Sequence, residues 1–231
     1  MSPGELNVAT TVSKERLRKY IPNFLLKQRS LISHLGLAAG GTYARLHLLD
    51  AIGIRKSNQR RPSDSVRSIL FVCFGNIMRS AMADRLMKQE VIDAGLQTEV
   101  KIASAGLHAS AGREADPWAQ QASADFGLSL VEHRAKPLTP EMVAEADCVF
   151  AMDFQNKAEL LTLYPESEDK IFMLSAYGEE AWSGREIADP YLGDLESTRL
   201  CARRLQICIR NLMVSLFPSC SFFKQHFRAN P

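Results

Sequence analysis

Short apolar runs alternate with amphipathic segments along the chain from residue 67 onward. Four runs have the length and composition of buried strands: 68–72, 100–104, 147–152 and 170–174. Four segments between and after these runs show helical spacing: 79–94, 117–126, 155–163 and 195–216. Strands that alternate with helices in this way predict a parallel sheet that is covered on both faces. The pattern therefore predicts a single three-layer α/β domain, in which a four-stranded parallel sheet is flanked by helices on both faces.

The first 66 residues show a different pattern. Large apolar residues lie among basic residues over 13–34, which predicts a basic amphipathic helix with a break at Pro22. A polar, basic stretch without apolar periodicity follows near residues 57–66 and is typical of a linker. We therefore predict three parts: a basic extension and linker that is partly helical or disordered over residues 1–66, the compact domain over 67–216, and a C-terminal tail over 217–231.

The distribution of charge also sets the extension apart. Residues 1–66 hold 11 Lys and Arg against 4 Asp and Glu, a net charge of +7, whereas the remaining residues hold 17 against 22, a net charge of −5. A basic amphipathic segment is suited to docking on an anionic membrane surface or on a partner protein. The alternatives are a loosely ordered appendage and translation from an upstream start codon. Charge alone also permits contact with nucleic acid, but no motif supports it, so no nucleic-acid partner is expected.

The cysteines and the apolar runs bear on the location of the protein. The five cysteines form no paired framework, and no CxxC or cysteine–histidine spacing suggests zinc: Cys73, Cys148, Cys201, Cys208 and Cys220. The N-terminus lacks a basic-then-apolar signal pattern, and no apolar run approaches the roughly 18–20 residues that span a bilayer. We therefore expect a reducing, cytoplasmic location and no structural metal.

Cys73 lies where the first predicted strand ends and the chain approaches the first predicted helix. Ligands of a parallel α/β sheet bind beyond the carboxyl ends of the strands, where loops lead into helix N-termini. Such a loop presents backbone N–H groups and the positive end of a helix dipole, which bind an oxyanion such as phosphate and favour thiolate over thiol. Cys73 is therefore a candidate nucleophile in a phosphate-binding loop.

The residues that follow Cys73 suit the same chemistry. Gly75 allows a tight turn, and Asn76 tolerates left-handed backbone geometry while its side-chain amide fixes the loop. Arg79 supplies a planar, permanently charged fork for two phosphate oxygens and for the charge that develops on them during transfer. Ser80 is suited to cap the helix or to donate a hydrogen bond to the thiolate. The alternative, a buried strand-end cysteine before an ordinary loop, accounts for less of this pattern.

The segment CFGNIMRS, residues 73–80, resembles the phosphate-binding loop of the low-molecular-weight protein tyrosine phosphatases, commonly written C-x-G-N-x-C-R-S-P. The resemblance continues in family order through further blocks: SAGLHASAGREADPWA (104–119), GLSLVEHRAKPL (127–138), FAMDFQN (150–156) and ADPYLGD (188–194). The small-residue loop after SAGL resembles the bacterial branch, whose members often oppose tyrosine kinases of capsule and exopolysaccharide export. The resemblance implies a hydrolase of phosphotyrosine that works through a phosphocysteine intermediate, without a metal or organic cofactor.

The resemblance also implies roles for residues outside the loop. Asp189 matches the family's general acid, which protonates the phenolic oxygen and later deprotonates a water. Tyr191 matches the aromatic wall against which the substrate ring stacks. His133 matches a histidine that holds Asn76, and Asp153 matches a carboxylate that supports the loop or positions the acid. The implied catalytic residues are Cys73, Arg79 and Asp189, and the implied phosphate-binding residues are Phe74, Gly75, Asn76, Ile77, Met78, Arg79 and Ser80.

Two other functions fit parts of the pattern. A thioredoxin-linked arsenate reductase resembles this family in fold and loop, but its chemistry requires two further cysteines to resolve the adduct. The position where one is expected holds Met152, and Cys148 lies within a predicted strand. A catalytically silent phosphate-binding or docking module does not require Cys73, Arg79 and Asp189 together. The sequence therefore favours the phosphatase over both.

Two departures from the family's loop lead to a testable prediction. Met78 stands where the family has a second cysteine, and Ala81 stands where it has a proline. In members with that cysteine, a reversible disulfide protects the nucleophile from over-oxidation. Oxidised Cys73 has no such neighbour in the loop, so inactivation by mild peroxide should be poorly reversed by thiols. Full recovery of activity with dithiothreitol would contradict this expectation.

Overall fold

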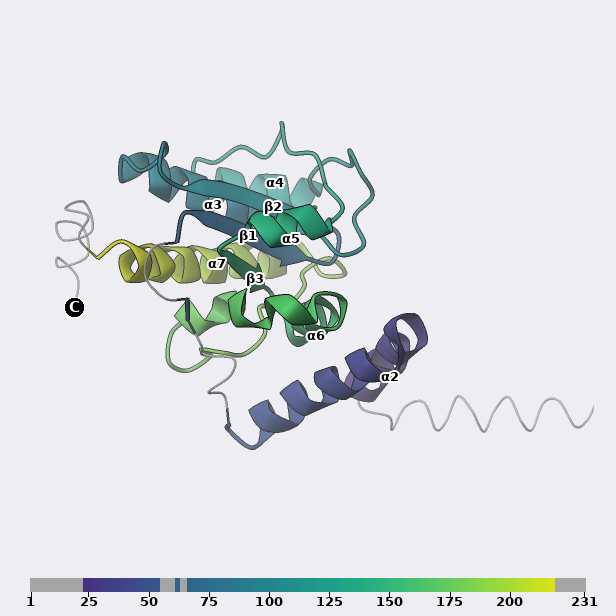
Figure 1. Ribbon diagram of the computed structural model, residues 1–231. Helices are drawn as coiled ribbons and strands as arrows, with labels where there is room; N and C mark the ends of the chain where they lie inside the picture. Colours follow the sequence, from purple (N-terminus) through teal and green to yellow (C-terminus); the bar gives the residue numbers. More distant parts are fainter. Residues whose placement is uncertain (1–22, 55–60, 63–65, 219–231) are drawn as a thin grey trace, which may run out of the picture.

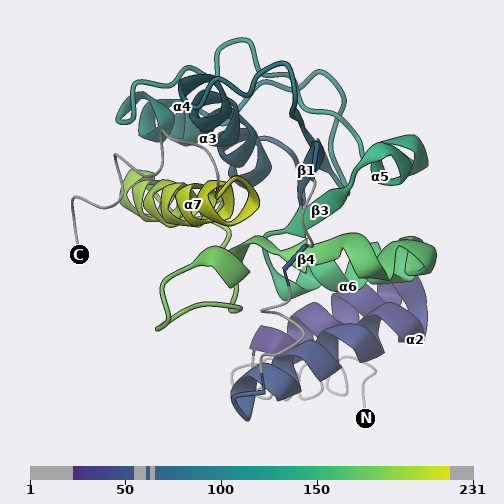
Figure 2. The same ribbon diagram turned by 60° about the vertical axis from the view of Figure 1, so that its left-hand side comes forward.

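The computed structural model describes residues 23–54, 61–62 and 66–218 of the chain. Four parallel strands form a sheet in the order β2-β1-β3-β4 (Figures 1 and 2). The strands are β1 (Ser68–Cys73), β2 (Lys101–Gly106), β3 (Cys148–Ala151) and β4 (Ile171–Met173). Each predicted strand is present to within two residues at either end. The predicted α/β class with a four-stranded parallel sheet is therefore confirmed.

Strand β1 is central and pairs with β2 on one edge and β3 on the other. Its side chains alternate between two apolar clusters, with Ile69, Phe71 and Cys73 in one and Leu70 and Val72 in the other. All five are buried because the strand has a neighbour on each edge and helices on each face. Such burial requires apolar residues on both faces, which is why this run is continuous in the sequence.

Helices cover both faces of the sheet (Figure 2). One cluster joins the sheet to α3 (Arg79–Asp93), α4 (Pro117–Ala124) and α7 (Leu195–Leu216), and the other joins it to α5 (Pro140–Glu145) and α6 (Phe154–Leu163). The four predicted helices correspond to α3, α4, α6 and α7, again to within two residues. The short elements α5, η1 (Pro165–Lys170) and η2 (Leu174–Tyr177) were not predicted. They are too short to show an apolar period.

A further helix, α2 (Asn23–Ala51), packs on the outside of α6 (Figures 1 and 2). It is kinked at Gly36, whose φ of 80° lies in the left-handed region that glycine adopts without strain. Tyr43 and Leu46 lie three residues apart on one face of α2 and are buried in the same cluster as Phe154 and Ala158 of α6. Over this part of the extension, the structure thus describes a helix that packs on the domain.

The structure covers only part of what was expected of the extension. Residues 13–22 of the predicted amphipathic helix, including the break at Pro22, lie outside the described residues. Leu48 on α2 and Ile52 just after its end are exposed, and docking of this part of the chain on a membrane surface or a partner protein stays a prediction. Among the residues that the structure describes, no helix is long and apolar enough to cross a membrane.

The contact between α2 and α6 leads to a prediction about stability. Leu46→Ala should lower the free energy of unfolding by about 2–3 kcal/mol, because it removes buried methyl groups from this contact. Unfolding by urea, followed by circular dichroism, measures the change. Leu48→Ala is the matched control on the exposed surface of the same helix and should change the value by less than about 0.5 kcal/mol. Equal effects of the two variants would contradict the packing of α2 on α6.

Candidate active site

The loop between β1 and α3 turns around the sulfur atom of Cys73. The backbone N–H of Asn76 donates to Cys73 Sγ at 3.3 Å, and the hydroxyl of Ser80, in the first turn of α3, lies 2.9 Å from the same sulfur. Asn76 has a φ of 52°, a left-handed geometry that asparagine tolerates better than most residues. The sulfur therefore lies at the carboxyl end of a central strand and at a helix N-terminus, a position that favours anions.

The side chain of Asn76 ties this loop to its surroundings. Its Nδ2 donates to Ser80 Oγ at 2.9 Å and to Ser104 Oγ at 3.0 Å, and its Oδ1 accepts from the backbone N–H of Lys136 at 2.9 Å. The Nε2 of His133 lies 2.7 Å from the Asn76 carbonyl oxygen and acts as the donor to it. The structure thus places His133 against the backbone of Asn76. Ser104 and Lys136 were not predicted as partners because they lie far from Asn76 in the sequence.

Gly106, at the end of β2, allows the loop to lie close to the sheet. A Cβ atom at this position would come within 2.8 Å of the backbone nitrogen of Asn76, which real Cβ atoms essentially never do. The backbone of the loop cannot move away without disturbing the hydrogen bonds of Asn76. The glycine of the SAGL segment is therefore required by the shape of the site.

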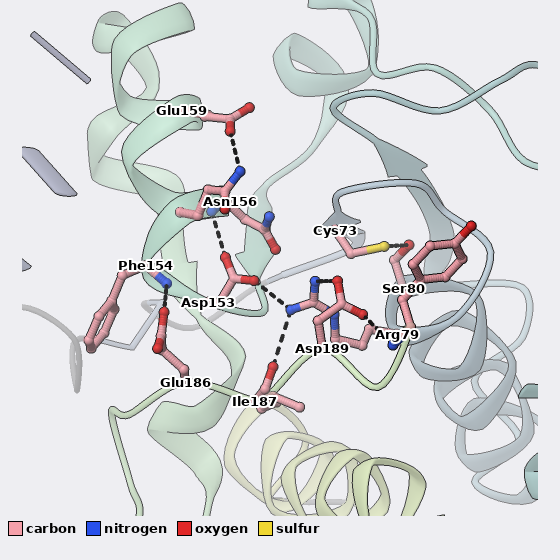
Figure 3. Close-up of polar contacts among 12 residues, drawn as sticks. Cys73, Arg79, Ser80, Asp153, Phe154, Asn156, Glu159, Glu186, Ile187 and Asp189 are labelled. Atoms are coloured by element: carbon pink, nitrogen blue, oxygen red, sulfur yellow. Dashed lines mark hydrogen bonds and ion pairs between the residues drawn. The ribbon is translucent and has the colours of Figure 1, made fainter. Parts of the chain in front are cut away.

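Arg79 is buried at the start of α3, with 1% of the residue exposed. Its Nη1 donates to Asp153 Oδ2 at 2.6 Å and to the carbonyl oxygen of Ile187 at 3.2 Å, and its Nη2 pairs with the carboxylate of Asp189 (Figure 3). Burial alone would lower the pKa of Arg79, but the charges of Asp153, Asp189 and Cys73 raise it above its ordinary value. The guanidinium therefore keeps its charge in this buried position.

The two carboxylates around Arg79 differ in their exposure. The side chain of Asp153 is 14% exposed and caps α6, because its second oxygen accepts from the backbone N–H of Asn156 at 2.7 Å. The side chain of Asp189 is 40% exposed and also accepts from the backbone N–H of Tyr191 at 3.2 Å. Asp153 is thus placed to orient the guanidinium, whereas Asp189 is placed to reach a molecule that enters the site.

A cavity of about 150 Å³ gives access to Cys73. Phe74 and Tyr191 line it and are 45% and 50% exposed. The ring of Phe74 lies 4.5 Å from the imidazole of His108, and the guanidinium of Arg113 lies 5.9 Å from the centre of the Tyr191 ring. A cavity with an anion-binding base and aromatic walls is suited to an aryl phosphate.

Three residues of this region, His108, Arg113 and Glu159, were not predicted. The Nε2 of His108 lies 2.7 Å from the Glu159 carboxylate, whose side chain is 2% exposed, and Gln155 donates to the other carboxylate oxygen at 3.1 Å. Glu159 therefore fixes His108 against Phe74. His108 and Arg113 lie in the loop that follows the second strand. Because parallel neighbouring strands end at the same edge of the sheet, their position after that strand could have indicated that they lie near Cys73. No signal marked Glu159, which is 51 residues from His108.

Comparison with known proteins agrees with this geometry. The family model described as low molecular weight phosphotyrosine protein phosphatase matches residues 68–219. The chain therefore belongs to this family and is a phosphoric monoester hydrolase. The match begins at the start of β1, so α2 lies outside the region that defines the family.

Relatives and solved structures show the extent of the likeness. The probable low molecular weight protein-tyrosine-phosphatase EpsP of Ralstonia nicotianae is 36% identical over 126 residues, which are 54% of this chain and 79% of that protein. The protein-arginine-phosphatase of Bacillus subtilis is 34% identical over 148 residues, 64% of this chain and 95% of that protein. The crystal structure of the tyrosine phosphatase AmsI of Erwinia amylovora superimposes with a TM-score of 0.59 at 31% identity, over 66% of this chain and 94% of that one.

Three other described cysteines differ from Cys73 in their surroundings. Cys148, Cys201 and Cys208 are free and buried. Burial raises the pKa of Cys201 to about 12 and also raises the pKa values of Cys148 and Cys208. Within the described ranges, no three His, Cys, Asp or Glu side chains are grouped so that they would hold a metal ion.

These differences predict selective alkylation. Iodoacetate at neutral pH should modify Cys73 before Cys148, Cys201 or Cys208. The sulfur of Cys73 lies at a helix N-terminus and lines an open cavity, whereas burial raises the pKa of the other three thiols. Inorganic phosphate should slow the modification of Cys73, because it competes for the same anion-binding loop. Peptide mapping by mass spectrometry measures both effects, with denatured protein as the control that loses selectivity. If any of the other three cysteines were labelled faster than Cys73 in folded protein, Cys73 would not be the reactive thiolate that we assign as nucleophile.

Proposed function

We propose that the protein hydrolyses phosphotyrosine in a protein substrate through a phosphocysteine intermediate. The observation that carries the proposal is the presence of Cys73, Arg79 and Asp189 on one cavity with aromatic walls. The contact between Arg79 and Asp189 puts a fixed cation and a carboxyl group beside the space that the Cys73 sulfur faces. The reaction as proposed uses no metal and no organic cofactor.

Binding of the substrate uses the loop and both aromatic walls. The backbone N–H groups of residues 74–79 and the guanidinium of Arg79 bind the phosphate oxygens, which releases Arg79 from Asp189. Asp153 remains on Arg79 and keeps the guanidinium in place. The tyrosine ring enters between Phe74 and Tyr191, and stacking on these rings places the phosphorus atom near the sulfur.

Two displacements at phosphorus then complete the reaction. In the first, the Cys73 thiolate attacks phosphorus, so that the S–P bond forms while the P–O bond to the phenol breaks, and Asp189 gives its proton to the phenolic oxygen. In the second, Asp189 takes a proton from water, the water oxygen attacks phosphorus and the S–P bond breaks. The hydroxyl of Ser80, 2.9 Å from the sulfur, stabilises the thiolate that leaves. Inorganic phosphate and the dephosphorylated tyrosine are the products.

The arginine phosphatase among the relatives raises a second candidate substrate, phosphoarginine. The walls of the cavity favour the aryl substrate, because Phe74, Ile77 and Tyr191 offer apolar and aromatic surface to a ring. Arg113, which lines the same cavity near Tyr191, repels the cationic guanidinium that phosphoarginine leaves behind. We therefore propose phosphotyrosine rather than phosphoarginine.

The protein substrate that we propose is a tyrosine kinase of exopolysaccharide export. The resemblance to the bacterial branch of the family supports this, because members of that branch often oppose such kinases. A full-length Cys73→Ala variant keeps the phosphate-binding loop but has no nucleophile, and should therefore retain the phosphorylated kinase from its host. Failure of this variant to retain any phosphotyrosine protein would argue against the proposed substrate.

Hydrolysis of p-nitrophenyl phosphate and of a phosphotyrosine peptide in the presence of a metal chelator tests the mechanism. Wild-type protein should turn over both. Cys73→Ser should abolish turnover, and Asp189→Ala should lower kcat for the peptide by about 10²–10³-fold, because the phenolic oxygen then leaves without a proton. Glu180→Ala removes an exposed carboxylate from the same region of the chain and should leave the rates unchanged.

Three results would contradict the proposal in different ways. Folded, reduced wild-type protein without turnover would indicate a silent phosphate-binding module. Faster hydrolysis of a phosphoarginine peptide than of the phosphotyrosine peptide would reverse the choice of substrate. Reduction of arsenate with thioredoxin as electron donor would favour the reductase.

A further inference from the structure

The extension reaches the loop that carries Asp189 through a histidine. The Nε2 of His47 on α2 lies 3.9 Å from Oε1 of Glu186, which precedes Asp189 by three residues. The imidazole packs edge-on against the ring of Phe154 at 5.0 Å and against the ring of Tyr43 at 4.4 Å. These aromatic contacts hold His47 in place, and 25% of its side chain is exposed. A side chain of the extension thus lies against the start of the loop over residues 186–189, which we call the acid loop because it carries Asp189.

Glu186 joins that loop to the beginning of α6. Its Oε1 accepts a hydrogen bond from the backbone N–H of Phe154 at 3.1 Å (Figure 3). Phe154 is the first residue of α6 and follows Asp153, the carboxylate that holds Arg79. The residue after Glu186 is Ile187, whose carbonyl oxygen accepts from Arg79 at 3.2 Å. Glu186 is therefore connected to two groups that contact the guanidinium of Arg79: to Asp153 through the hydrogen bond with Phe154, and to the carbonyl of Ile187 through the chain.

Electrostatics explain why Glu186 needs a partner here. Three carboxylates lie in this corner of the molecule: Asp153, Glu186 and Asp189 (Figure 3). Burial raises the pKa of Tyr43, and the charges of Glu186 and Asp153 raise it further, which is consistent with both carboxylates lying close to α2. Like charges repel, so donors must hold Glu186 in this position. The backbone at the N-terminus of α6 donates a hydrogen bond to Glu186, and the imidazole of His47, when protonated, adds a positive charge 3.9 Å from the same carboxylate oxygen.

We propose that His47 is a positioning residue for the general acid. It holds Glu186 at the start of α6 and thereby sets the place of Asp189 at the cavity. Glu186 and Asp189 are separated by two residues, so a shift of the first moves the second. The proposal rests on the proposed function, in which Asp189 protonates the departing phenolic oxygen. Because His47 lies outside the region that matches the family, this control of the acid belongs to the extension.

The dependence of the rate on the leaving group provides the test. Phenol is a poor leaving group, with a pKa near that of tyrosine, ~10, and needs the proton of Asp189, whereas p-nitrophenol leaves readily without it. A displaced acid therefore lowers kcat/KM for phenyl phosphate more than for p-nitrophenyl phosphate. General damage to the fold or to the phosphate-binding loop lowers both alike. The inhibition constant of inorganic phosphate reports on the loop separately.

Full-length His47→Ala should lower kcat/KM for phenyl phosphate by about 10-fold and for p-nitrophenyl phosphate by less than about 2-fold, with unchanged inhibition by phosphate. Leu48→Ala, an exposed position on the same helix, should behave as the wild type. In an Asp189→Ala background, His47→Ala should not change the ratio of the two substrates further, since the acid is already absent.

Several outcomes would overturn the inference. An unchanged substrate ratio in folded His47→Ala would do so, as would an equal loss on both substrates. If His47→Ala fails to fold by circular dichroism, Glu186→Ala must show the selective loss in its place, and its absence overturns the inference. A wild type that turns over neither substrate overturns the proposed function, and this inference with it.

Discussion

The buried guanidinium of Arg79 is the interaction on which the rest of the site depends. A charge in this position is costly unless it is paired, and removal of one partner of a buried ion pair costs about 3–5 kcal/mol because the other charge is left uncompensated. Its partners come from two distant segments, since Asp153 and Asp189 follow Arg79 by 74 and 110 residues. The turn after β3 and the loop before α7 must therefore close over the start of α3 for the fold to contain this residue.

The same arrangement separates two tasks between two carboxylates. Asp153 is mostly buried and is held as the cap of α6, so it keeps its contact with Arg79 when a phosphate binds. Asp189 is more exposed, and a bound phosphate competes with it for the guanidinium. In the proposed mechanism, the loss of that contact frees its carboxyl group for proton transfer when a substrate is present. In that mechanism, the guanidinium of Arg79 couples the binding of phosphate to the release of Asp189.

The extension adds a layer to the three-layer domain and also a connection to its site. Tyr43 and Leu46 complete the apolar cluster around α6, and His47, on the same helix, lies against Glu186 and Phe154. The apolar contact of Tyr43 and Leu46 with α6 is therefore next to the contact of His47 with Glu186 along the same helix. The proposed influence of α2 on the site, from outside the region that matches the family, relies on α6, which begins directly after Asp153, the partner of Arg79.

The sequence by itself determined the strands, the main helices and the loop from Cys73 to Ser80. Strands buried on both faces must be apolar throughout, and the loop is contiguous, so its glycine, asparagine and arginine stand at readable positions. Only the tertiary structure decided that α2 packs on α6, that Glu159 holds His108 and that His47 meets Glu186. Periodicity and local motifs reflect interactions within a few residues along the chain. The partners of a charged or aromatic side chain depend instead on which loops and helices come together at the edge of the sheet. The spacing of residues along the sequence does not show which of these elements will be in contact.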